Sequence, residues 1–348
     1  MLKAPDPLAA LALPLGNGEC ALPEGDGVFL NADHQADLAE IVRSRVTCEQ
    51  PFRPAFERLE SAGWRVAPRV DGSFAFAIVL LGKHAEENRL NLARAYRMLS
   101  AGGLFVLAGS NEIGAARWER AILPWLAAPE SRFKHKSRIA WGRKPESGEP
   151  AEIASWIALD GAQPILDGRY SSSIGLFGWN KIDPGSALLV EHLPEGIAGR
   201  VADLGAGWGF LSDYLLRHYP AIRSLDVIEA DARGIAAAER NLAPIEGQAE
   251  RGFRWIDATK GLPEQYDWIL CNPPFHDGKE AKPELGQAIL AAAGPALVPG
   301  GTLMVVANRL LPYEEKLTAA LGEVERLVDR DGFKVLRIVR RSASSRNR

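Results

Sequence analysis

Two stretches of this chain, far apart in the sequence, share one plan of strand, helix, glycine pair and strand. In the first, an apolar run at residues 74–84 and a helical segment precede Gly102-Gly103. In the second, residues 266–276 and another helical segment precede Gly300-Gly301. After each pair comes an apolar strand that ends in small or amide residues. Every α/β fold reuses such units, but the matched glycine pairs favour a duplicated α/β domain.

The length of the chain, 348 residues, agrees with two domains, because single hydrophobic cores rarely grow so large. Residues 141–156 are rich in proline, glycine and charge, as linkers are. We therefore expect a first domain over residues 1–145, a linker over 146–165, a second domain over 166–340 and a basic, disordered tail over 341–348.

The cysteines and the first residues indicate the compartment. Cys20, Cys48 and Cys271 show no spacing typical of a zinc site or a disulfide framework, which indicates a reducing environment. Prolines interrupt the start of the chain and only Lys3 carries a positive charge there, which argues against a signal peptide. No apolar run is long enough to span a bilayer. We expect a cytoplasmic, monomeric protein with no metal and no membrane association.

A glycine-rich loop follows a strand expected at residues 201–204 and precedes a helix from about residue 210. Gly205, Gly207 and Gly209 alternate along it, which permits a tight turn and the close approach of a ligand to the backbone. The next strand ends in Glu229, where a carboxylate can accept hydrogen bonds from ribose hydroxyls. A purely structural glycine turn is the alternative. The strand, the helix and Glu229 together favour the binding of a nucleoside.

The same loop indicates which cofactor carries that nucleoside. Its GxGxG pattern differs from the GxGxxG fingerprint of dinucleotide sites, and Asp203 suits an ammonium group better than a pyrophosphate. S-adenosylmethionine has that chemistry. A third strand over residues 253–259 contains Asp257, which can accept from the exocyclic amine of adenine. On spacing alone, a solvated turn aspartate is an equal alternative for Asp257.

The fourth strand of this half ends in the sequence LCNPPFHDG. Asn272 offers a side-chain carbonyl, and the rigid pair Pro273-Pro274 fixes a backbone carbonyl beside it. Two fixed acceptors can hold both protons of an exocyclic amine and direct its lone pair at a sulfonium methyl group. Phe275 can stack on the base, which must be single-stranded or flipped out. As an isolated tetrapeptide, the motif would be more simply explained as a proline-rich turn.

With these motifs the chain resembles class I S-adenosylmethionine-dependent methyltransferases, and more closely the bacterial methyltransferases for guanine N2 in 16S or 23S ribosomal RNA. The segments that carry the resemblance are DLGAGWGFLS, NPPFHDG, VANRLLPYE and GFKVLR. It implies an α/β chain of two tandem Rossmann-like methyltransferase domains. The N-terminal copy would be degenerate and serve folding or RNA engagement, with Leu81-Gly82-Lys83 where the catalytic C-terminal copy has Asn-Pro-Pro.

The resemblance also implies roles for single residues. It assigns cofactor binding to Asp203, Gly205, Gly207 and Glu229, to which the third strand adds Asp257. It assigns the holding of the base to Asn272, Pro273, Pro274 and Phe275. His276 is expected to contact the substrate rather than act as general base, because a methylated amine loses its proton readily. Family members carry an Asp-x-Gly-Ser or Asp-x-Gly-Thr core, here residues 183–186, expected in a flap over the cofactor. Phe177 would lie near the site or in the core, and Ser186 would cap the following helix.

Two basic runs are candidate phosphate contacts despite the net charge of −3. Residues 131–144 contain six lysines and arginines and no acid, and Lys134, Lys136 and Arg138 are the expected RNA contacts. Residues 334–348 also contain six and no acid. Such runs are usually only solvated faces, and Trp141 favours RNA contact for the first run. The expected partner is ribosomal RNA or a ribosomal subunit.

The leading hypothesis is methyl transfer to guanine N2 in ribosomal RNA, with 16S RNA favoured over 23S RNA. Adenine N6 and a protein glutamine amide are the alternative methyl acceptors, since the same two fixed hydrogen-bond acceptors can hold the NH₂ group of guanine, adenine or glutamine. A nicotinamide-dependent oxidoreductase would need a titratable catalytic residue at the sheet edge, and Asn-Pro-Pro-Phe supplies none. A non-catalytic RNA-binding or assembly factor is a further alternative, supported only by the inactive-looking first half.

Overall fold

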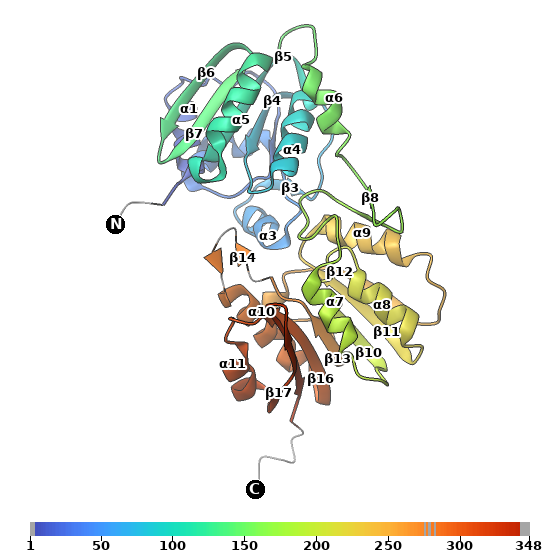
Figure 1. Cartoon of the computed structure of the whole chain (residues 1–348). Coiled ribbons are helices and arrows are strands. Elements are labelled where there is room, and N and C mark those ends of the chain that lie inside the picture. Colours follow the sequence, from blue (N-terminus) through green and yellow to red (C-terminus); the bar gives the residue numbers. More distant parts are fainter. Residues whose placement is uncertain (1–3, 275, 278–279, 282, 342–348) are drawn as a thin grey trace. The chain divides into compact units, whose positions relative to one another are not determined.

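The computed structural model describes residues 4–274, 276–277, 280–281 and 283–341 (Figure 1). The chain divides into two compact units, Met1–Gly161 and Ala162–Arg348. This boundary falls inside the stretch expected as a linker, residues 146–165. Of the expected basic tail, only Arg341 belongs to the described residues.

The first unit is built on one seven-stranded sheet with the order β3-β2-β1-β4-β5-β7-β6. The strands from β3 to β5 are parallel to their neighbours, β7 is antiparallel to β5, and β6 is antiparallel to β7. The strands are β1 (Gly27–Leu30), β2 (Val46–Glu49), β3 (Arg65–Ala67), β4 (Phe74–Leu80), β5 (Leu99–Ser110), β6 (Ala127–Lys134) and β7 (Ser137–Arg143). The helices are α1 (Pro7–Gly16), α2 (Ala36–Val42), α3 (Arg53–Ser61), α4 (Ala85–Met98), α5 (Ala115–Ile122) and α6 (Ala151–Ile157).

The second unit repeats this sheet in the order β12-β11-β10-β13-β16-β18-β17, again with β18 and β17 antiparallel to their neighbours. Its sheet strands are β10 (Gly199–Leu204), β11 (Ile222–Glu229), β12 (Glu250–Trp255), β13 (Tyr266–Cys271), β16 (Leu297–Asn308), β17 (Val324–Arg330) and β18 (Phe333–Val339). Two short hairpins add β8 (Gln163–Ile165) with β9 (Tyr170–Ser172), and β14 (His276–Asp277) with β15 (Glu280–Ala281). The helices are α7 (Pro184–Glu191), α8 (Phe210–His218), α9 (Ala232–Leu242), α10 (Pro283–Ala296) and α11 (Tyr313–Ala320).

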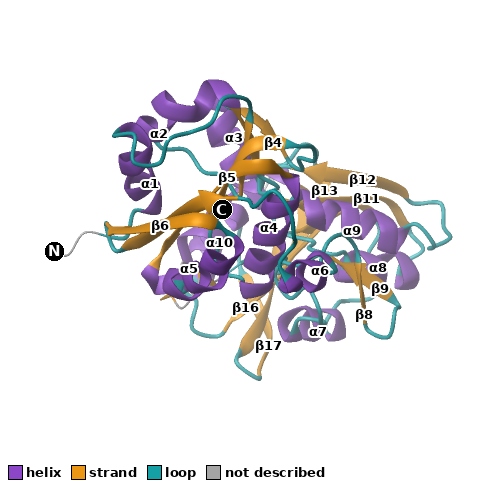
Figure 2. Ribbon diagram, turned by 90° about the horizontal axis from the view of Figure 1, so that it is seen from above, coloured by secondary structure: helices purple, strands orange, loops and turns teal. Residues whose placement is uncertain are grey.

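Helices cover both faces of the second sheet. Val201 and Leu270 pack with α7, α8 and α9, whereas their chain neighbours Ala202 and Cys271 pack with α10 and α11 on the opposite face. In Figure 2, α8 and α9 lie side by side next to β11. Burial on both faces explains why most residues of these central strands are apolar rather than alternating with polar ones. Two such layered units of equal strand order confirm the expected tandem Rossmann-like fold.

The glycine pairs occupy equivalent places in the two sheets. The first glycine of each pair has a positive φ, +72° and +83°, which favours glycine. A Cβ atom added to Gly103 would lie 3.1 Å from the carbonyl oxygen of Ala75, and one added to Gly301 would lie 3.1 Å from that of Tyr266. In both sheets the ladder register shifts at this point. In each sheet the glycine pair thus lets the long strand pass close to its neighbour, β5 to β4 in the first unit and β16 to β13 in the second.

Part of the expected linker is a helix that belongs to the first unit. Helix α6 packs against α4, and the ring of Trp156 contacts those of Trp118 and Trp125 at centroid distances of 6.1 and 5.1 Å. Proline and glycine around it suggested a linker, but its apolar face is buried at Ile153. Tertiary packing therefore orders this stretch.

Candidate active site

The glycine-rich loop connects β10 to α8. Gly205, Gly207 and Gly209 have φ values of +78°, +55° and +93°, a backbone conformation that other residues rarely adopt. A Cβ on Gly209 would lie 3.1 Å from the Cβ of Ala238, so this glycine lets α8 and α9 pack closely. A Cβ on Gly207 would meet nothing within 4 Å, so space remains beside the loop backbone. The loop therefore combines close helix packing with an accessible backbone.

Glu229 holds the loop in this conformation. Its carboxylate accepts hydrogen bonds from the backbone N–H groups of Gly207 at 2.8 Å, Ala230 at 2.7 Å and Asp231 at 3.0 Å. Burial raises the pKa of this carboxyl, and these N–H donors oppose the effect. A Cβ on Gly234 would lie only 2.7 Å from the Glu229 Cγ, so α9 needs a glycine there. These three bonds leave one lone-pair site of the carboxylate, on Oε2, without a donor, and the role of Glu229 toward ribose hydroxyls stays a prediction.

Asp203, on β10, is fully buried. Its Oδ2 accepts a hydrogen bond from the Ser212 hydroxyl at 2.6 Å, while its Oδ1 is buried and has no partner among the described residues. Burial raises the pKa of this carboxyl to about 7, and the nearby Glu229 adds to the effect. A buried carboxylate oxygen without a donor is costly, and an ammonium group would satisfy it. The residues present therefore fit the cationic cofactor expected from the sequence.

Asp257 follows β12 and caps a short helical turn. Its Oδ1 accepts from the Thr259 backbone N–H at 3.0 Å and from the Thr259 hydroxyl at 2.6 Å. Ladder pairing puts β12 beside β11, so Asp257 and Glu229 follow neighbouring strand ends. Its role toward adenine stays a prediction.

Asn272 stands directly after β13. Its Nδ2 donates to the Asp183 carboxylate at 2.7 Å and to the Ser186 hydroxyl at 2.8 Å, which uses both amide hydrogens. Within the described part of the chain its Oδ1 accepts no hydrogen bond. Pro273 is buried and Pro274 is exposed. Phe275 and the side chain of His276 lie outside what the structure describes, so their roles also stay predictions.

The sheet brings the loop and this corner together. Strand β10 pairs with β13 up to Leu204 and Cys271, and a Cβ on Gly205 would lie 3.7 Å from the Asn272 carbonyl oxygen. Asp203, Glu229 and Asn272 thus lie at the carboxyl ends of three adjacent parallel strands. In open α/β sheets this edge is the usual place for ligands.

The segment between β9 and α7 carries Phe177, whose side chain is 63% exposed. The alternative that Phe177 is a core residue is therefore wrong. The Trp208 indole N–H of the glycine-rich loop donates to the Gly178 carbonyl at 3.3 Å, which ties this segment to the loop. Ser186 does not cap α7. The Asp183 carboxylate does so, by accepting the Ser186 backbone N–H at 3.0 Å, and the Ser186 hydroxyl is used by Asn272.

Sequence reasoning missed one further support of the loop. The amide of Asn241 on α9 donates to the carbonyls of Ser171 and Trp208, each at 2.8 Å, and accepts from the Ser171 N–H at 2.8 Å. It joins β9 to the glycine-rich loop. Nothing around Asn241 in the sequence marks it, because its partners are distant in the chain.

The corresponding strand ends of the first unit are filled by side chains. Ladder registers align Leu30 with Leu204 and Val79 with Cys271. Asn31 therefore stands where Gly205 does, and its Nδ2 donates to the Leu80 carbonyl at 2.9 Å. The expected alignment of Leu81-Gly82-Lys83 with Asn-Pro-Pro was one residue off. The register places residues 80–82 there, because the pairing starts equivalently at Phe74 and Tyr266.

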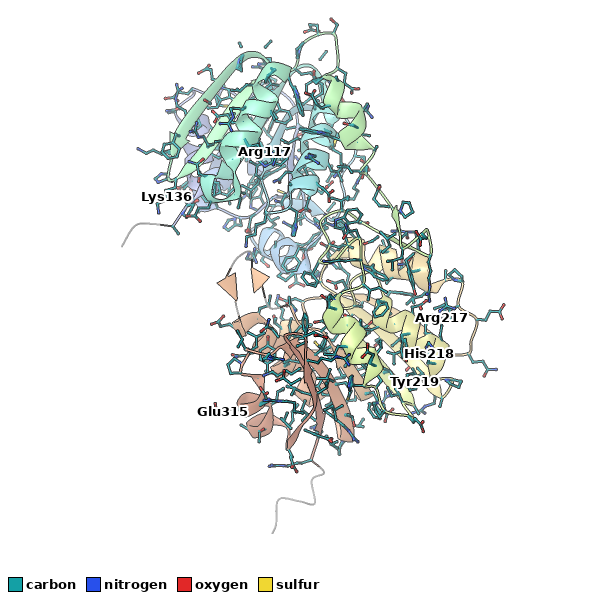
Figure 3. The ribbon with its side chains drawn as sticks, viewed as in Figure 1. Arg117, Lys136, Arg217, His218, Tyr219 and Glu315 are labelled. Carbon is teal, nitrogen blue, oxygen red and sulfur yellow. The ribbon has the colours of Figure 1, made fainter. Side chains whose placement is uncertain are left out.

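The first basic run forms the hairpin of β6 and β7 in the first unit. Lys134 is exposed, and Lys136 projects from the turn between the strands (Figure 3). No ion pair of either lysine occurs among the described residues. Arg138 instead pairs with the buried Glu119 at 2.9 Å and covers the Phe133 ring. These three residues belong to the first unit, and Asn272 belongs to the second.

The second basic run is mostly engaged within the fold. Lys334 is buried and donates to the Leu311 carbonyl at 2.7 Å and to the Glu314 carboxylate. Arg337 pairs with Glu325, and Arg340 donates to backbone carbonyls. The expectation that this run contacts phosphates is therefore wrong for Lys334, whose charge is enclosed by its partners.

A three-layer α/β unit with a GxGxG loop, an acidic residue after the second strand and an Asn-Pro-Pro corner after the fourth defines a class I methyltransferase. The family described as methyltransferase small domain matches residues 168–337. Among the described residues, no helix has the length and apolarity to cross a membrane. The described residues also contain no group of three His, Cys, Asp or Glu side chains that could hold a metal ion.

Relatives match most of the chain. A protein of Pseudomonas entomophila (strain L48) named ribosomal RNA small subunit methyltransferase C is 35% identical over 275 residues, 77% of this chain and 80% of the relative. Its namesake from Pseudomonas aeruginosa (strain UCBPP-PA14) is 28% identical over 333 residues, 94% of this chain and 93% of the relative. The chain belongs to the ribosomal RNA small subunit methyltransferase C family.

A solved structure shares the whole fold. It is described as the T. thermophilus 16S rRNA N2 G1207 methyltransferase (RsmC) in complex with AdoMet and guanosine. The TM-score is 0.77 at 25% sequence identity, over 97% of this chain and 92% of that one.

Proposed function

We propose that this protein transfers the methyl group of S-adenosylmethionine to the exocyclic N2 amine of a guanosine in 16S ribosomal RNA. The observation that carries the proposal is the Oδ1 of Asn272, which lies at the sheet edge next to the glycine-rich loop and accepts no hydrogen bond from any residue that the structure describes. Membership of the small subunit methyltransferase C family favours guanine N2 over the other planar nitrogens, and 16S over 23S RNA.

The cofactor would be held by residues at three neighbouring strand ends. Asp203 offers its unpaired Oδ1 to the ammonium group, Glu229 accepts from the ribose hydroxyls, and Asp257 accepts from the adenine amine. Gly205 and Gly207 allow the backbone to approach the ligand. The bound cofactor supplies an electrophilic methyl group on a positively charged sulfur.

Asn272 and Pro273 would act on the acceptor amine. The lone pair of an amine attached to a purine is shared with the ring, which makes the nitrogen a poor nucleophile. The Oδ1 of Asn272 and the carbonyl oxygen of Pro273 would accept its two hydrogens and turn the lone pair toward the methyl group. The amine would take up the methyl group that the cofactor supplies, which leaves S-adenosylhomocysteine, and would then release one proton. Catalysis is then positioning and fixed polarity, without a covalent enzyme intermediate.

The first unit would support the second and contribute to RNA binding. Lys134 and Lys136, exposed or half-buried near the hairpin turn, are available for phosphate contacts. We further propose a monomeric enzyme that acts in the cytoplasm, where ribosomal RNA is assembled. Phe177, exposed beside the loop, would lie against the base or the cofactor.

Asn272→Ala tests the site. It should abolish methyl transfer to ribosomal RNA or 30S particles while S-adenosylhomocysteine still binds in calorimetry. Wild-type transfer by this variant would overturn the assignment of Asn272. The target is found by mass spectrometry of nucleosides from each ribosomal RNA of a deletion strain. A missing N2-methylguanosine in 16S RNA supports the proposal, whereas a missing 23S or adenine methyl group, or no change, contradicts it.

A further inference from the structure

The amide of Asn272 is held in one orientation by two residues that lie far from it in the sequence. Its Nδ2 donates to Asp183 at 2.7 Å and to Ser186 at 2.8 Å. An aspartate carboxylate can only accept hydrogen bonds. If the amide rotated by half a turn, its Oδ1 would face that carboxylate and the hydrogen bond to Asp183 would be replaced by a repulsive contact, whereas the Ser186 hydroxyl can donate to Oδ1 in that orientation. The N-terminus of α7 therefore decides which atom of Asn272 points into the site.

Each residue of the Asp183-Pro184-Gly185-Ser186 sequence has a part in this arrangement. Asp183 caps α7 by accepting the Ser186 backbone N–H at 3.0 Å, which fixes the position of the carboxylate. Pro184 stands at the first turn of the helix, where its lack of an N–H costs nothing. A Cβ on Gly185 would lie 2.9 Å from the Asp183 Oδ2 and 3.1 Å from the Phe333 ring. Glycine thus gives the carboxylate room to reach both the helix and Asn272.

The same contacts strengthen Asn272 as an acceptor. Donation of a hydrogen bond to a carboxylate draws the amide protons away from nitrogen and places more negative charge on Oδ1. The hydroxyl of Ser186 adds a second acceptor on the same side. Asp183 and Ser186 would therefore affect the reaction without touching the substrate.

We propose that Asp183 and Ser186 are positioning residues, which present the Oδ1 of Asn272 to the acceptor amine and increase its basicity. This inference rests on the proposed function and adds to it two residues that act only through Asn272. It predicts a loss in kcat rather than in cofactor or RNA affinity, because neither ligand contacts these two residues directly in this scheme.

The test compares Asp183→Asn, Ser186→Ala and Ser186→Thr with the wild type. Asparagine is an equally good helix cap, so Asp183→Asn should fold normally yet let the Asn272 amide rotate. We expect kcat to fall about 10- to 100-fold in Asp183→Asn and about 10-fold in Ser186→Ala, the loss of a charged and a neutral hydrogen bond. Ser186→Thr keeps the hydroxyl and should retain activity. Asp6→Asn, the same exchange at the cap of α1 in the first unit, is the matched control.

A second measurement does not depend on the substrate. In NMR spectra of 15N-labelled protein, the side-chain amide signals that disappear in Asn272→Ala belong to Asn272. Their proton shifts should be downfield in the wild type and move upfield in Asp183→Asn but not in Asp6→Asn. If these signals and kcat are unchanged in Asp183→Asn, the positioning role is wrong. If the signals behave as expected but the wild type methylates no guanine, the proposed function fails and the amide orientation stands.

Discussion

Gln50 in the first unit and Glu229 in the second occupy the same place in two sheets of equal strand order. Gln50 follows the last residue pair between β2 and β1, and Glu229 follows the last pair between β11 and β10. Each accepts the backbone N–H of the residue two positions later, at 2.9 and 3.0 Å. They differ in the second polar atom of the side chain, which is a donor in Gln50 and an acceptor in Glu229. Gln50 donates to the Ala32 carbonyl at 2.7 Å, whereas Glu229 accepts from the Gly207 N–H at 2.8 Å. The Gln50 amide thus ties two segments of backbone together with one donated and one accepted bond, whereas the Glu229 carboxylate can only accept and has one lone-pair site left for a ligand.

Glu229→Gln should therefore weaken cofactor binding. The amide nitrogen would replace one acceptor where three N–H donors converge, leaving a donor unpaired. We expect the Kd for S-adenosylhomocysteine, measured by calorimetry, to rise at least about 10-fold, and the free energy of unfolding to fall by about 1–3 kcal/mol. Gln50→Glu is the matched control. It sets a carboxylate against the Ala32 carbonyl and should reduce stability by a similar amount without changing Kd. A wild-type Kd in Glu229→Gln would refute the role of this carboxylate.

Asp203 should make stability and cofactor affinity depend on pH in opposite directions. Burial raises the folded-state pKa of this carboxyl to about 7 from a usual value of 3.8. Its contribution to stability is therefore fully present below the usual pKa and is lost as the pH rises toward about 7. Urea titrations should therefore show that the free energy of unfolding of the wild type decreases over this pH range relative to that of Asp203→Asn. Affinity for the cofactor should instead rise over the same range, since the ionised form binds the ammonium group. A flat difference curve would contradict the assignment.

Gly286 and Tyr313 should show strong energetic coupling. A Cβ on Gly286 would lie 2.1 Å from the phenolic oxygen of Tyr313 and 3.4 Å from the Pro274 carbonyl oxygen. Gly286→Ala should therefore reduce the free energy of unfolding by about 1–3 kcal/mol. The Tyr313 hydroxyl is buried without a partner among the described residues, and burial raises its pKa to about 12. Tyr313→Phe should be neutral or stabilising by up to about 1 kcal/mol, and should partly rescue Gly286→Ala. Strict additivity in denaturation would exclude the clash.

The basic residues of the β6–β7 hairpin should differ in role, with the two lysines contributing to RNA binding and Arg138 to stability. Lys134→Gln combined with Lys136→Gln should leave stability unchanged and lower the salt dependence of RNA binding, by roughly one to two units in the slope of log K against log salt. The control is the double variant Arg58→Gln and Arg97→Gln, which removes two exposed arginines of the same unit, each of which forms an ion pair with an acidic residue. Arg138→Gln should mainly destabilise, by about 1–3 kcal/mol, because it leaves the buried Glu119 without its partner. An unchanged salt slope in the lysine double variant would remove the hairpin from the RNA interface.

Local sequence patterns predicted the parts of this site that single segments form. The alternating glycines, the acidic residue after the next strand and the Asn-Pro-Pro corner depend on strand ends, and the parallel sheet brings those ends together. The partners of each side chain were harder to predict. Asp183 lies 89 residues before Asn272, and only packing of α7 against the sheet brings them into contact.

Charge runs were the least informative pattern. Lys334 and Arg138 stand in stretches without acidic residues, yet acids from other segments of the fold pair with both of them. Sequence neighbours do not reveal such partners, because a strand residue contacts residues on adjacent strands and covering helices. Lys134, near a hairpin turn with neighbours on one side only, stays exposed as its sequence suggested.

The hydrogen bond from Asn31 to the Leu80 carbonyl bears on how the two halves diverged after duplication. Asn31→Gly alone would leave that carbonyl without its donor, and Gln50→Glu alone would set two acceptors against each other. An acidic residue at Phe29, where Asp203 stands in the second half, would enter a closed apolar core. Each of these three changes toward the residues of the second unit would thus lower the stability of the first unit before it created a ligand contact. A binding site at this edge of the first unit would therefore need several substitutions together, because each one alone disturbs a contact that stabilises the fold.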